Sequence, residues 1–258
     1  MKKLFLKLFG FRFMLICGDP LVIDRWIWLK SKLPRTNNNE KLLDIGCGSG
    51  GFTIGAAMRG YESLGVSWDQ RNQRVAEYRA ELLGVKTVNF EIYDVRNLDN
   101  KSQWFEKFDI CINFENIEHI LNDNKLIKDI TKCLKPGGRL LLTTPYYLYN
   151  PINNEDMGPF LPIENGKHVR RGYSEAMLRE LFDNSGLKIE KFEYCSGFLS
   201  QKLCAIQRCI SKINPTLAWG LILPFRFFPI IMDPFFLFIS KYPSYSICVE
   251  GYKPRFDK

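Results

Sequence analysis

Residues 42–54 read LLDIGCGSGGFTI, an apolar run that ends in an acid and continues into a glycine-rich loop. Glycines stand at positions 46, 48, 50 and 51, and the apolar residues after them are typical of a helix. Glycine lets backbone N–H groups approach a ligand closely, and a helix N-terminus favours negative charge. A strand that stops in such a loop therefore predicts a ligand site.

The loop fits two nucleotide-binding patterns. GCGSGG matches the dinucleotide fingerprint through Gly46, Gly48 and Gly51. It also matches D-x-G-x-G-x-G through Asp44 and Gly50, a pattern that resembles motif I of the class I S-adenosylmethionine-dependent methyltransferases. The carboxylate of Asp44 suits the cationic amine and sulfonium of S-adenosylmethionine, whereas it would repel a pyrophosphate. A structural glycine turn without a ligand is the third interpretation.

The next apolar run, residues 61–66, bears on which cofactor fits. A dinucleotide enzyme places an acid at the end of this strand for the ribose, but Ser67 stands there. Asp69 is expected to cap the following helix. Many methyltransferases also have an acid at the strand end, so the chain resembles subfamilies in which an amide of that helix reaches the ribose. Asn72 occupies the expected position, and Gln73 is its neighbour.

Further segments extend the resemblance over residues 41–195 and 245–252. TVNFEIYDV ends in Asp94 and Val95, which match the family position that receives adenine. FDICINFENIEHI resembles motif IV, and LIKDITKCLKPGGRLLLTTP resembles the family's helix, Pro-Gly-Gly turn and fifth strand. The cofactor-binding set that the resemblance implies is Asp44, Gly46, Cys47, Gly48, Gly50, Ser67, Asn72, Asp94, Val95, Asn113 and Glu115.

Strands and helices alternate along the chain, which predicts an α/β fold with helices on both faces of the sheet. The resemblance implies a Rossmann-like, seven-stranded, mostly parallel sheet in the order 3-2-1-4-5-7-6, with an antiparallel seventh strand. Expected strands are 41–45, 61–66, 87–92, 108–113, 139–144, 187–195 and 245–252. Expected helices are 21–33, 51–58, 70–83, 122–134, 174–185 and 197–212.

The organisation predicted from these patterns is a methyltransferase core at 36–196, completed by a last strand and tail at 245–258. Residues 1–35 form a basic, apolar N-terminal helical segment, and residues 197–244 form a helical, apolar insertion. A chain of 258 residues is long enough for one large domain. Its eight cysteines show no CxxC pair, which indicates reduced thiols in a cytoplasmic protein.

The net charge of +8 is concentrated in the two flanks. Residues 1–35 carry eight basic and two acidic residues, and residues 197–258 carry eight basic and three acidic residues, whereas residues 36–196 have a charge of −3. Phe and Leu dominate the basic segments, so no DNA partner is expected and RNA is disfavoured.

The flanks are also strongly apolar. The N-terminal run is interrupted by basic residues and has no signal-peptide cleavage site. Residues 217–239 are long enough to suggest a transmembrane helix, but three prolines, Arg226 and Asp233 argue against it. Both flanks are predicted either to lie on an anionic membrane surface, making the protein peripheral at the inner face, or to pack together over the core.

A cluster of ionisable residues follows the fourth expected strand, in the segment ENIEH. His119 or His168 is the candidate general base, with a carboxylate such as Glu115 to orient it. No metal is expected in this interpretation. Alternatively, Glu115, Glu118, His119 and His168 bind a divalent cation, as in the metal sites of ubiquinone-pathway and small-RNA 2′-O-methyltransferases that this segment resembles. Capping of the following segment without chemistry is the third interpretation.

The function predicted from these features is S-adenosylmethionine-dependent methylation, with a hydrophobic or lipid-linked small molecule as the acceptor. A glycan or quinone precursor methylated on oxygen fits the apolar flanks and the ubiquinone-pathway-like branch of the family. The alternatives are an RNA 2′-O-methyltransferase with a divalent metal, an NAD-dependent oxidoreductase and a non-catalytic cofactor-binding protein.

Overall fold

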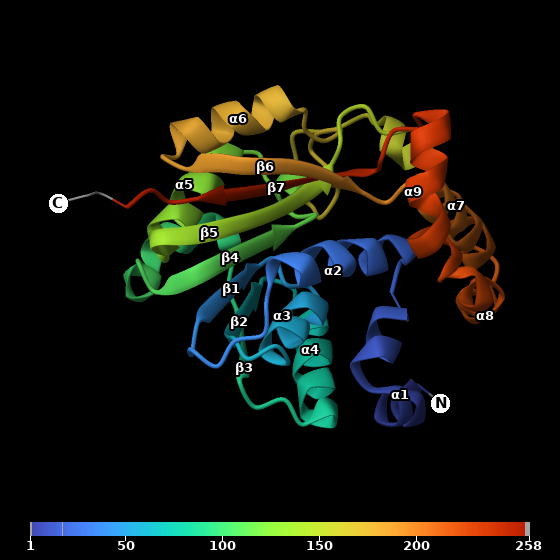
Figure 1. Cartoon of the computed structure of the whole chain (residues 1–258), viewed down its shortest axis with the longest axis horizontal. Helices are drawn as coiled ribbons and strands as arrows, with labels where there is room; N and C mark the ends of the chain where they lie inside the picture. Colours follow the sequence, from blue (N-terminus) through green and yellow to red (C-terminus); the bar gives the residue numbers. More distant parts are fainter. Residues whose placement is uncertain (1, 17, 256–258) are drawn as a thin grey trace.

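The computed structural model describes residues 2–16 and 18–255. It is built on one sheet of seven strands in the order β3-β2-β1-β4-β5-β7-β6 (Figure 1). All neighbouring strands are parallel except β7, which is antiparallel to β5 and β6. The predicted fold class and strand order are therefore confirmed. The strands are β1 (Lys41–Ile45), β2 (Glu62–Ser67), β3 (Val88–Ile92), β4 (Phe108–Phe114), β5 (Leu134–Pro145), β6 (Lys188–Cys195) and β7 (Ser246–Tyr252).

Helices cover both faces of this sheet. Residues of the central strands point alternately to the two faces, so each face carries an apolar cluster that a layer of helices buries. Leu43 belongs to the cluster under α5 and α6, and its neighbour Leu42 belongs to the one under α2 and α3. The helices of the core are α2 (Pro20–Lys32), α3 (Gly51–Ala57), α4 (Gln70–Leu83), α5 (Asp123–Cys133) and α6 (Glu175–Asn184). Five short 3-10 helices are described, η1 (Val95–Asn100), η2 (Ser102–Trp104), η3 (Ile117–His119), η4 (Asn154–Met157) and η5 (Leu223–Phe225).

Local capping explains where several helices begin. The carboxylate of Asp69 accepts hydrogen bonds from the backbone N–H groups of Arg71 (2.9 Å) and Asn72 (3.2 Å), so α4 starts as predicted. Ser174 caps α6 by accepting from Met177 N. These side chains satisfy backbone donors that a helix leaves unpaired in its first turn.

β5 begins five residues earlier than expected, at Leu134 rather than at residue 139. Leu134 pairs with Phe108 of β4, and the register then shifts before Ile110 pairs with Arg139. The Pro-Gly-Gly turn thus lies inside the strand as an irregularity, where Gly137 has a positive φ of 81°. The sequence pattern marks this turn as a boundary, but pairing with β4 continues across it.

The flanking segments form further helices, α1 (Lys2–Ile16), α7 (Phe198–Ser211), α8 (Pro215–Ile222) and α9 (Phe228–Ser240). Leu6, Phe13 and Met14 of α1 pack in one apolar cluster with residues of α3 and α4. The helices α7, α8 and α9 lie together beyond one end of the sheet, between β6 and β7 in the chain (Figure 1). Parts of the expected segments 1–35 and 245–258, namely residues 1, 17 and 256–258, lie outside the described residues, as do the side chains of residues 2–5, 7 and 155.

Within the described residues, no single helix has both the length and the apolar composition needed to cross a membrane. Residues 215–225 and 228–240 pass that test only when taken as a pair, and the pair is bent by 67°. The bend follows from the sequence, because proline removes a helical hydrogen bond and Pro224 and Pro229 flank the break.

Candidate functional site

The glycine loop between β1 and α3 has a backbone shape that larger residues do not readily adopt. Gly46 has φ of 83°, and a Cβ atom there would lie 2.6 Å from the side chain of Asn116. Gly50 has φ of 76°, and its Cβ would lie 2.6 Å from that of Ala76. Glycine at these two positions therefore permits both the turn and its close approach to the neighbouring segments.

Asp44 lies at the end of β1, just before this loop. Its side chain is buried and accepts a hydrogen bond from Thr53 Oγ1 of α3 at 2.6 Å. Burial raises the pKa of Asp44 to about 7, against the opposing effect of the Thr53 hydrogen bonds. A cationic group placed nearby would favour the ionised form, so the site is suited to a positively charged ligand.

The residues after β2 do not all face the loop. The amide of Asn72 is exposed and donates to Asp69 Oδ2 at 2.7 Å, so it takes part in the cap of α4. Its neighbour Gln73 is buried, and neither amide atom of Gln73 has a hydrogen-bond partner among the described residues. Ser67 is also buried, and its hydroxyl accepts from Asp69 N at 3.3 Å.

The expected adenine position is occupied by an ion pair. Asp94 accepts hydrogen bonds from the guanidinium of Arg96, at 2.6 to 3.0 Å, and this interaction lowers the pKa of Asp94. Arg96 also pairs with Glu164, a residue of the long loop after β5. Val95 beside them is buried. The carboxylate of Asp94 is therefore fixed in its ionised form.

Two further predicted residues are buried next to the loop. Asn113 of β4 donates from Nδ2 to the carbonyl of Ile45 at 2.9 Å, whereas its Oδ1 has no partner within the described part of the chain. Cys47 is buried in the loop, and burial raises the pKa of its thiol. These contacts join the end of β4 to the end of β1, where parallel sheets place their ligands.

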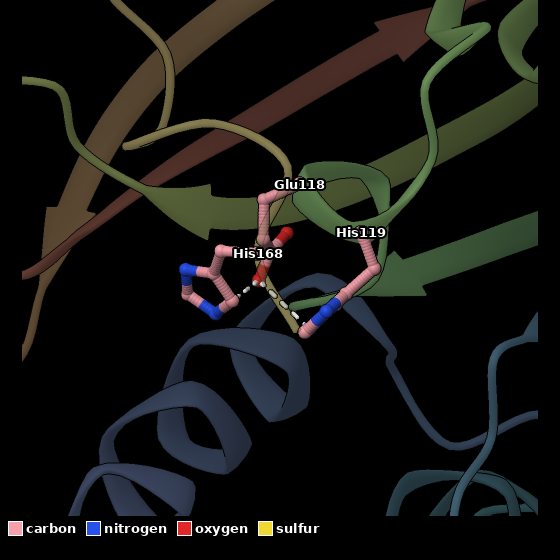
Figure 2. A group of neighbouring side chains, drawn as sticks. All are labelled: Glu118, His119 and His168. Carbon is pink, nitrogen blue, oxygen red and sulfur yellow. Dashed lines mark ion pairs between the residues drawn. The ribbon is translucent and has the colours of Figure 1, made fainter. Parts of the chain in front are cut away.

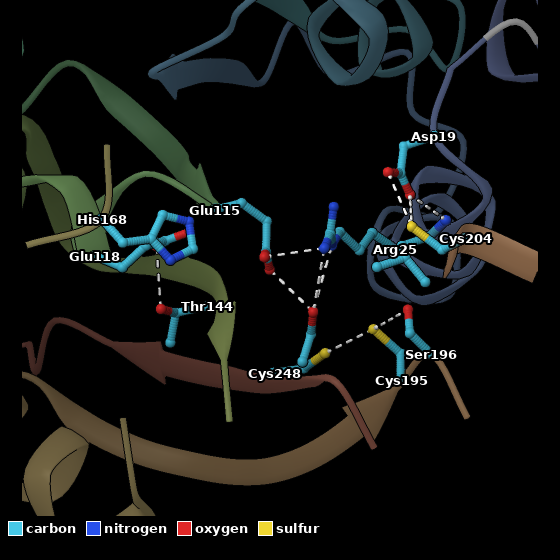
Figure 3. A network of polar contacts seen from close by, with 12 residues as sticks. Asp19, Arg25, Glu115, Glu118, Thr144, His168, Cys195, Ser196, Cys204 and Cys248 are labelled. Carbon is cyan, nitrogen blue, oxygen red and sulfur yellow. Dashed lines mark hydrogen bonds and ion pairs between the residues drawn. The ribbon is translucent and has the colours of Figure 1, made fainter. Parts of the chain in front are cut away.

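Glu115, predicted to lie with the histidines, is bonded instead to residues of α2 and β7 and is not part of the Glu118–His119–His168 group. Its Oε2 forms an ion pair with Arg25 Nη2 of α2 at 2.9 Å, and its Oε1 accepts from Ser246 Oγ of β7 at 3.0 Å (Figure 3). Glu115 also has a positive φ of 47°, which is uncommon for a residue other than glycine. Arg25 is a partner that the sequence did not indicate, because α2 is remote in the chain.

Glu118, His119 and His168 form the cluster at the carboxyl edge of the sheet (Figure 2). Each histidine places its Nε2 atom 4.0 Å from Glu118 Oε1, and the two imidazole rings are 4.7 Å apart. Glu118 is 0% exposed. Its Oε2 accepts from Thr144 Oγ1 at 3.1 Å, and its Oε1 has no hydrogen-bond partner among the described residues.

The long loop after β5 brings His168 to this cluster. Val169 N donates to the carbonyl of Glu118 at 2.9 Å, and this hydrogen bond holds the preceding residue, His168, near Glu118. Arg170 pairs with Asp123 and donates to the carbonyl of Ile120 at 2.8 Å. Arg170 therefore anchors the loop.

Burial controls the charge of the cluster. It raises the pKa of Glu118 well above the ordinary value, with a further contribution from the charge of Glu115. Burial also lowers the pKa of His119, and burial together with His119 lowers the pKa of His168 to about 4. At neutral pH the cluster thus offers two neutral imidazoles and one carboxyl group whose Oε1 accepts no hydrogen bond from the described residues.

The sequence of this chain is similar to those of known proteins. Residues 23–191 match the model of a methyltransferase domain family. A ubiquinone biosynthesis O-methyltransferase of Pelagibacter ubique is 29% identical over 130 residues, which are 48% of this chain and 52% of that protein. The corresponding protein of Coxiella burnetii is 30% identical over 132 residues, or 49% and 55%. The chain spans about half the length of these curated relatives.

Solved structures agree on the fold. Phosphoethanolamine N-methyltransferase 2 of Haemonchus contortus, solved with S-adenosyl-L-methionine, superposes with a TM-score of 0.65 at 17% identity, covering 99% of this chain and 60% of that one. The family match decides between the two cofactor patterns of the glycine loop and disfavours the dinucleotide interpretation. This chain belongs to the class I S-adenosylmethionine-dependent methyltransferases.

Proposed function

We propose that this protein transfers a methyl group from S-adenosylmethionine to an oxygen atom of a hydrophobic or lipid-linked small molecule. The observation that carries the proposal is the Glu118–His119–His168 cluster at the sheet edge that also holds the glycine loop. Gly46 touches the segment that leads into the cluster, through Asn116. A cofactor on the loop and an acceptor at the cluster would therefore be neighbours.

The cofactor would be held by residues of β1, β2, β3 and their loops. Asp44 suits the amine of the cofactor, and Asp94 with the N–H of Val95 suits the adenine. For the ribose hydroxyls we assign Gln73 in place of Asn72. A buried amide without a partner is costly, and a hydrogen-bonding ligand would satisfy it.

Titration calorimetry with S-adenosylmethionine tests this assignment. Asp44→Ala and Gln73→Leu should each weaken binding by about ten-fold or more, since each removes a buried polar partner of the ligand. Asn72→Ala is the matched control on the same helix and should leave the affinity within about two-fold. Equal losses at Gln73 and Asn72 would refute the ribose assignment.

The cluster fits a divalent cation better than a histidine base. A base works best with a pKa near the operating pH, but burial moves the pKa of His168 to about 4. Neutral imidazoles are suitable cation ligands, and a cation would favour the ionised form of Glu118. Glu118 Oε1 is left without a hydrogen-bond partner in the described structure. A bound cation would supply Lewis-acid polarisation of an acceptor hydroxyl.

Cation binding can be measured without turnover. Calorimetric titration of the chelator-treated protein with Mg²⁺, Mn²⁺ and Zn²⁺ should show one site that Glu118→Gln removes. Glu180→Gln, at an exposed position of α6, is the control and should bind normally. Activity that survives chelation but is lost in His119→Asn would instead establish the general-base interpretation.

The loop at 146–173 favours an apolar acceptor. It exposes several large apolar side chains, although it is fixed against the cluster. These are Tyr147, Leu148, Met157, Leu161 and Ile163. The curated relatives are named as O-methyltransferases of ubiquinone biosynthesis, which supports oxygen as the methylated atom.

Incubation of lipid and polar extracts with methyl-labelled cofactor tests the acceptor. We expect label in an organic-soluble product, with the methyl group located on an oxygen atom by mass spectrometry and nuclear magnetic resonance. Label in RNA, with binding that weakens as salt increases, would support the RNA 2′-O-methyltransferase alternative. The −3 charge of residues 36–196 argues against that alternative.

A further inference from the structure

In the segment from α8 to α9, the charged side chains are buried and large apolar side chains are exposed, the reverse of the usual arrangement in a helix that faces water. Residues 215–240 contain two charged side chains, and both are buried, Arg226 at 2% and Asp233 at 6% exposure. In contrast, Ile231 and Phe238 are 74% and 85% exposed. Large apolar side chains that are exposed in this segment are Leu217, Leu221, Phe225, Phe227, Phe228, Ile230, Ile231, Phe235, Phe238 and Ile239.

The buried charges fix the orientation of the segment. The carboxylate of Asp233 accepts hydrogen bonds from Leu199 N (2.6 Å) and Ser200 N (3.1 Å), at the N-terminus of α7. Gly197 allows this approach, because a Cβ there would lie 2.7 Å from Asp233 Cγ. Arg226 donates to Gln207 Oε1 of α7 at 2.7 Å. The apolar side faces outward because the polar residues are bonded inward.

The helix α1 packs against this segment. Trp219 Nε1 of α8 donates to the carbonyl of Ile16 at 3.2 Å, and its ring meets that of Phe13 edge-on. Phe13 in turn contacts Phe9, which is exposed together with Leu8. Two segments that are distant in sequence, α1 and α8, therefore pack against each other, and each carries exposed apolar side chains.

Basic residues are exposed on α1, on the neighbouring helix α7 and at the end of α9. Lys202 of α7, Lys212 at the end of α7 and Lys241 at the end of α9 are exposed, as is Arg12 of α1. The chain regions that carry them have net charges of +6 and +5, against −3 for the core. Anionic headgroups complement this charge, and aromatic side chains flanked by Lys are typical of helices that lie in a bilayer interface.

We propose that the outer face of α1, α8 and α9 docks this protein onto an anionic lipid bilayer, with α8 and α9 lying in the interface. The 67° bend fits two short helices along a surface better than one straight span. The membrane surface is independent of the methyl acceptor, so either proposal can fail while the other holds.

Flotation of the full chain with lipid vesicles tests the docking. Vesicles of phosphatidylcholine alone and with phosphatidylglycerol are compared at about 0.05 M and about 0.5 M salt. The protein should float with the anionic vesicles at low salt, and binding should weaken at high salt. Ile231, Phe235 and Phe238 lie at helical spacing on α9 and are all exposed. Their combined substitution by Ser should lower the partition coefficient by at least about ten-fold.

A matched control replaces three exposed apolar residues of α4 and α6, Val75, Tyr78 and Met177, by Ser and should float normally. Replacing Lys202, Lys212 and Lys241 by Gln should lower binding to anionic vesicles by about five-fold per lysine, with little change on neutral ones. Circular dichroism of each variant confirms folding.

Three results would overturn the docking proposal. These are failure of the folded protein to float with any vesicle, equal flotation of the α9 variant and the control, and loss of self-association in the α9 variant without any change in flotation. The last would identify the surface as an interface between copies of the chain.

Discussion

The carboxyl edge of the sheet and the α8–α9 segment both bury ionisable side chains, but these side chains differ in how far they are hydrogen-bonded. At the sheet edge, Glu118 keeps an oxygen without a hydrogen-bond partner among the described residues, beside two histidines. In the α8–α9 segment, both carboxylate oxygens of Asp233 accept hydrogen bonds from α7, and the apolar residues are the ones exposed. A buried polar group with spare bonding capacity indicates a ligand, whereas one with bonded partners indicates structure.

The largest expected effect is at the sheet edge. Glu118→Gln removes the ionisable carboxyl group of the cluster while it keeps the size of the side chain. Methyl transfer to the labelled product should fall by about 10²- to 10⁴-fold, as for loss of a group that activates the acceptor. Cofactor affinity should stay within about two-fold by calorimetry. A variant with normal turnover would place the chemistry elsewhere.

The next largest effect is at the ion pair that joins α2 to the sheet edge. Arg25→Met leaves Glu115 partly buried without its cation, so the free energy of unfolding should fall by about 3 kcal/mol. Urea denaturation followed by circular dichroism measures this change. Arg12→Met, at an exposed position of α1, is the control. If both variants unfold at the same urea concentration, the Arg25–Glu115 pair does not stabilise the site.

A smaller effect, dependent on pH, is expected where α2 meets the N-terminus of α7. Burial and, secondarily, the charge of Asp233 raise the pKa of Asp24 to about 6 from 3.8, against opposing hydrogen bonds. The folded state therefore retains a proton that the unfolded chain has lost. Stability should decrease by at most about 3 kcal/mol as pH rises through that interval. Asp24→Asn should abolish this decrease, and parallel stability curves for the two proteins would contradict the assignment.

The smallest expected effect is inside the α8–α9 segment. Asp233→Ala removes the acceptor of two backbone N–H groups of α7, which should cost about 1–2 kcal/mol and lower Tm. Thr216→Ala, at an exposed position of α8, is the control. An unchanged Tm in a scanning calorimeter would show that Asp233 does not hold α9 in its outward-facing orientation.

Much of the core was predictable because its signals are local. The glycine loop after β1, the cap of α4 at Asp69 and the strand order all followed from patterns within the sequence or from the family that those patterns resemble. The sequence did not predict which of two adjacent amide side chains is buried and available to a ligand. Asn72 and Gln73 differ by one position on α4, and only the packed structure shows which amide is exposed and which is buried.

The sequence by itself determined the fold and the family, since hydrophobic periodicity and a glycine loop act over a few residues. Tertiary structure alone decided that Glu118, rather than Glu115, lies beside the two histidines. The two glutamates are chemically alike, and Arg25 of a distant helix engages one of them. It also decided that the apolar residues of α9 face outward, because Asp233 finds its partners on α7. Both outcomes depend on contacts between segments far apart in the chain, which no local pattern encodes.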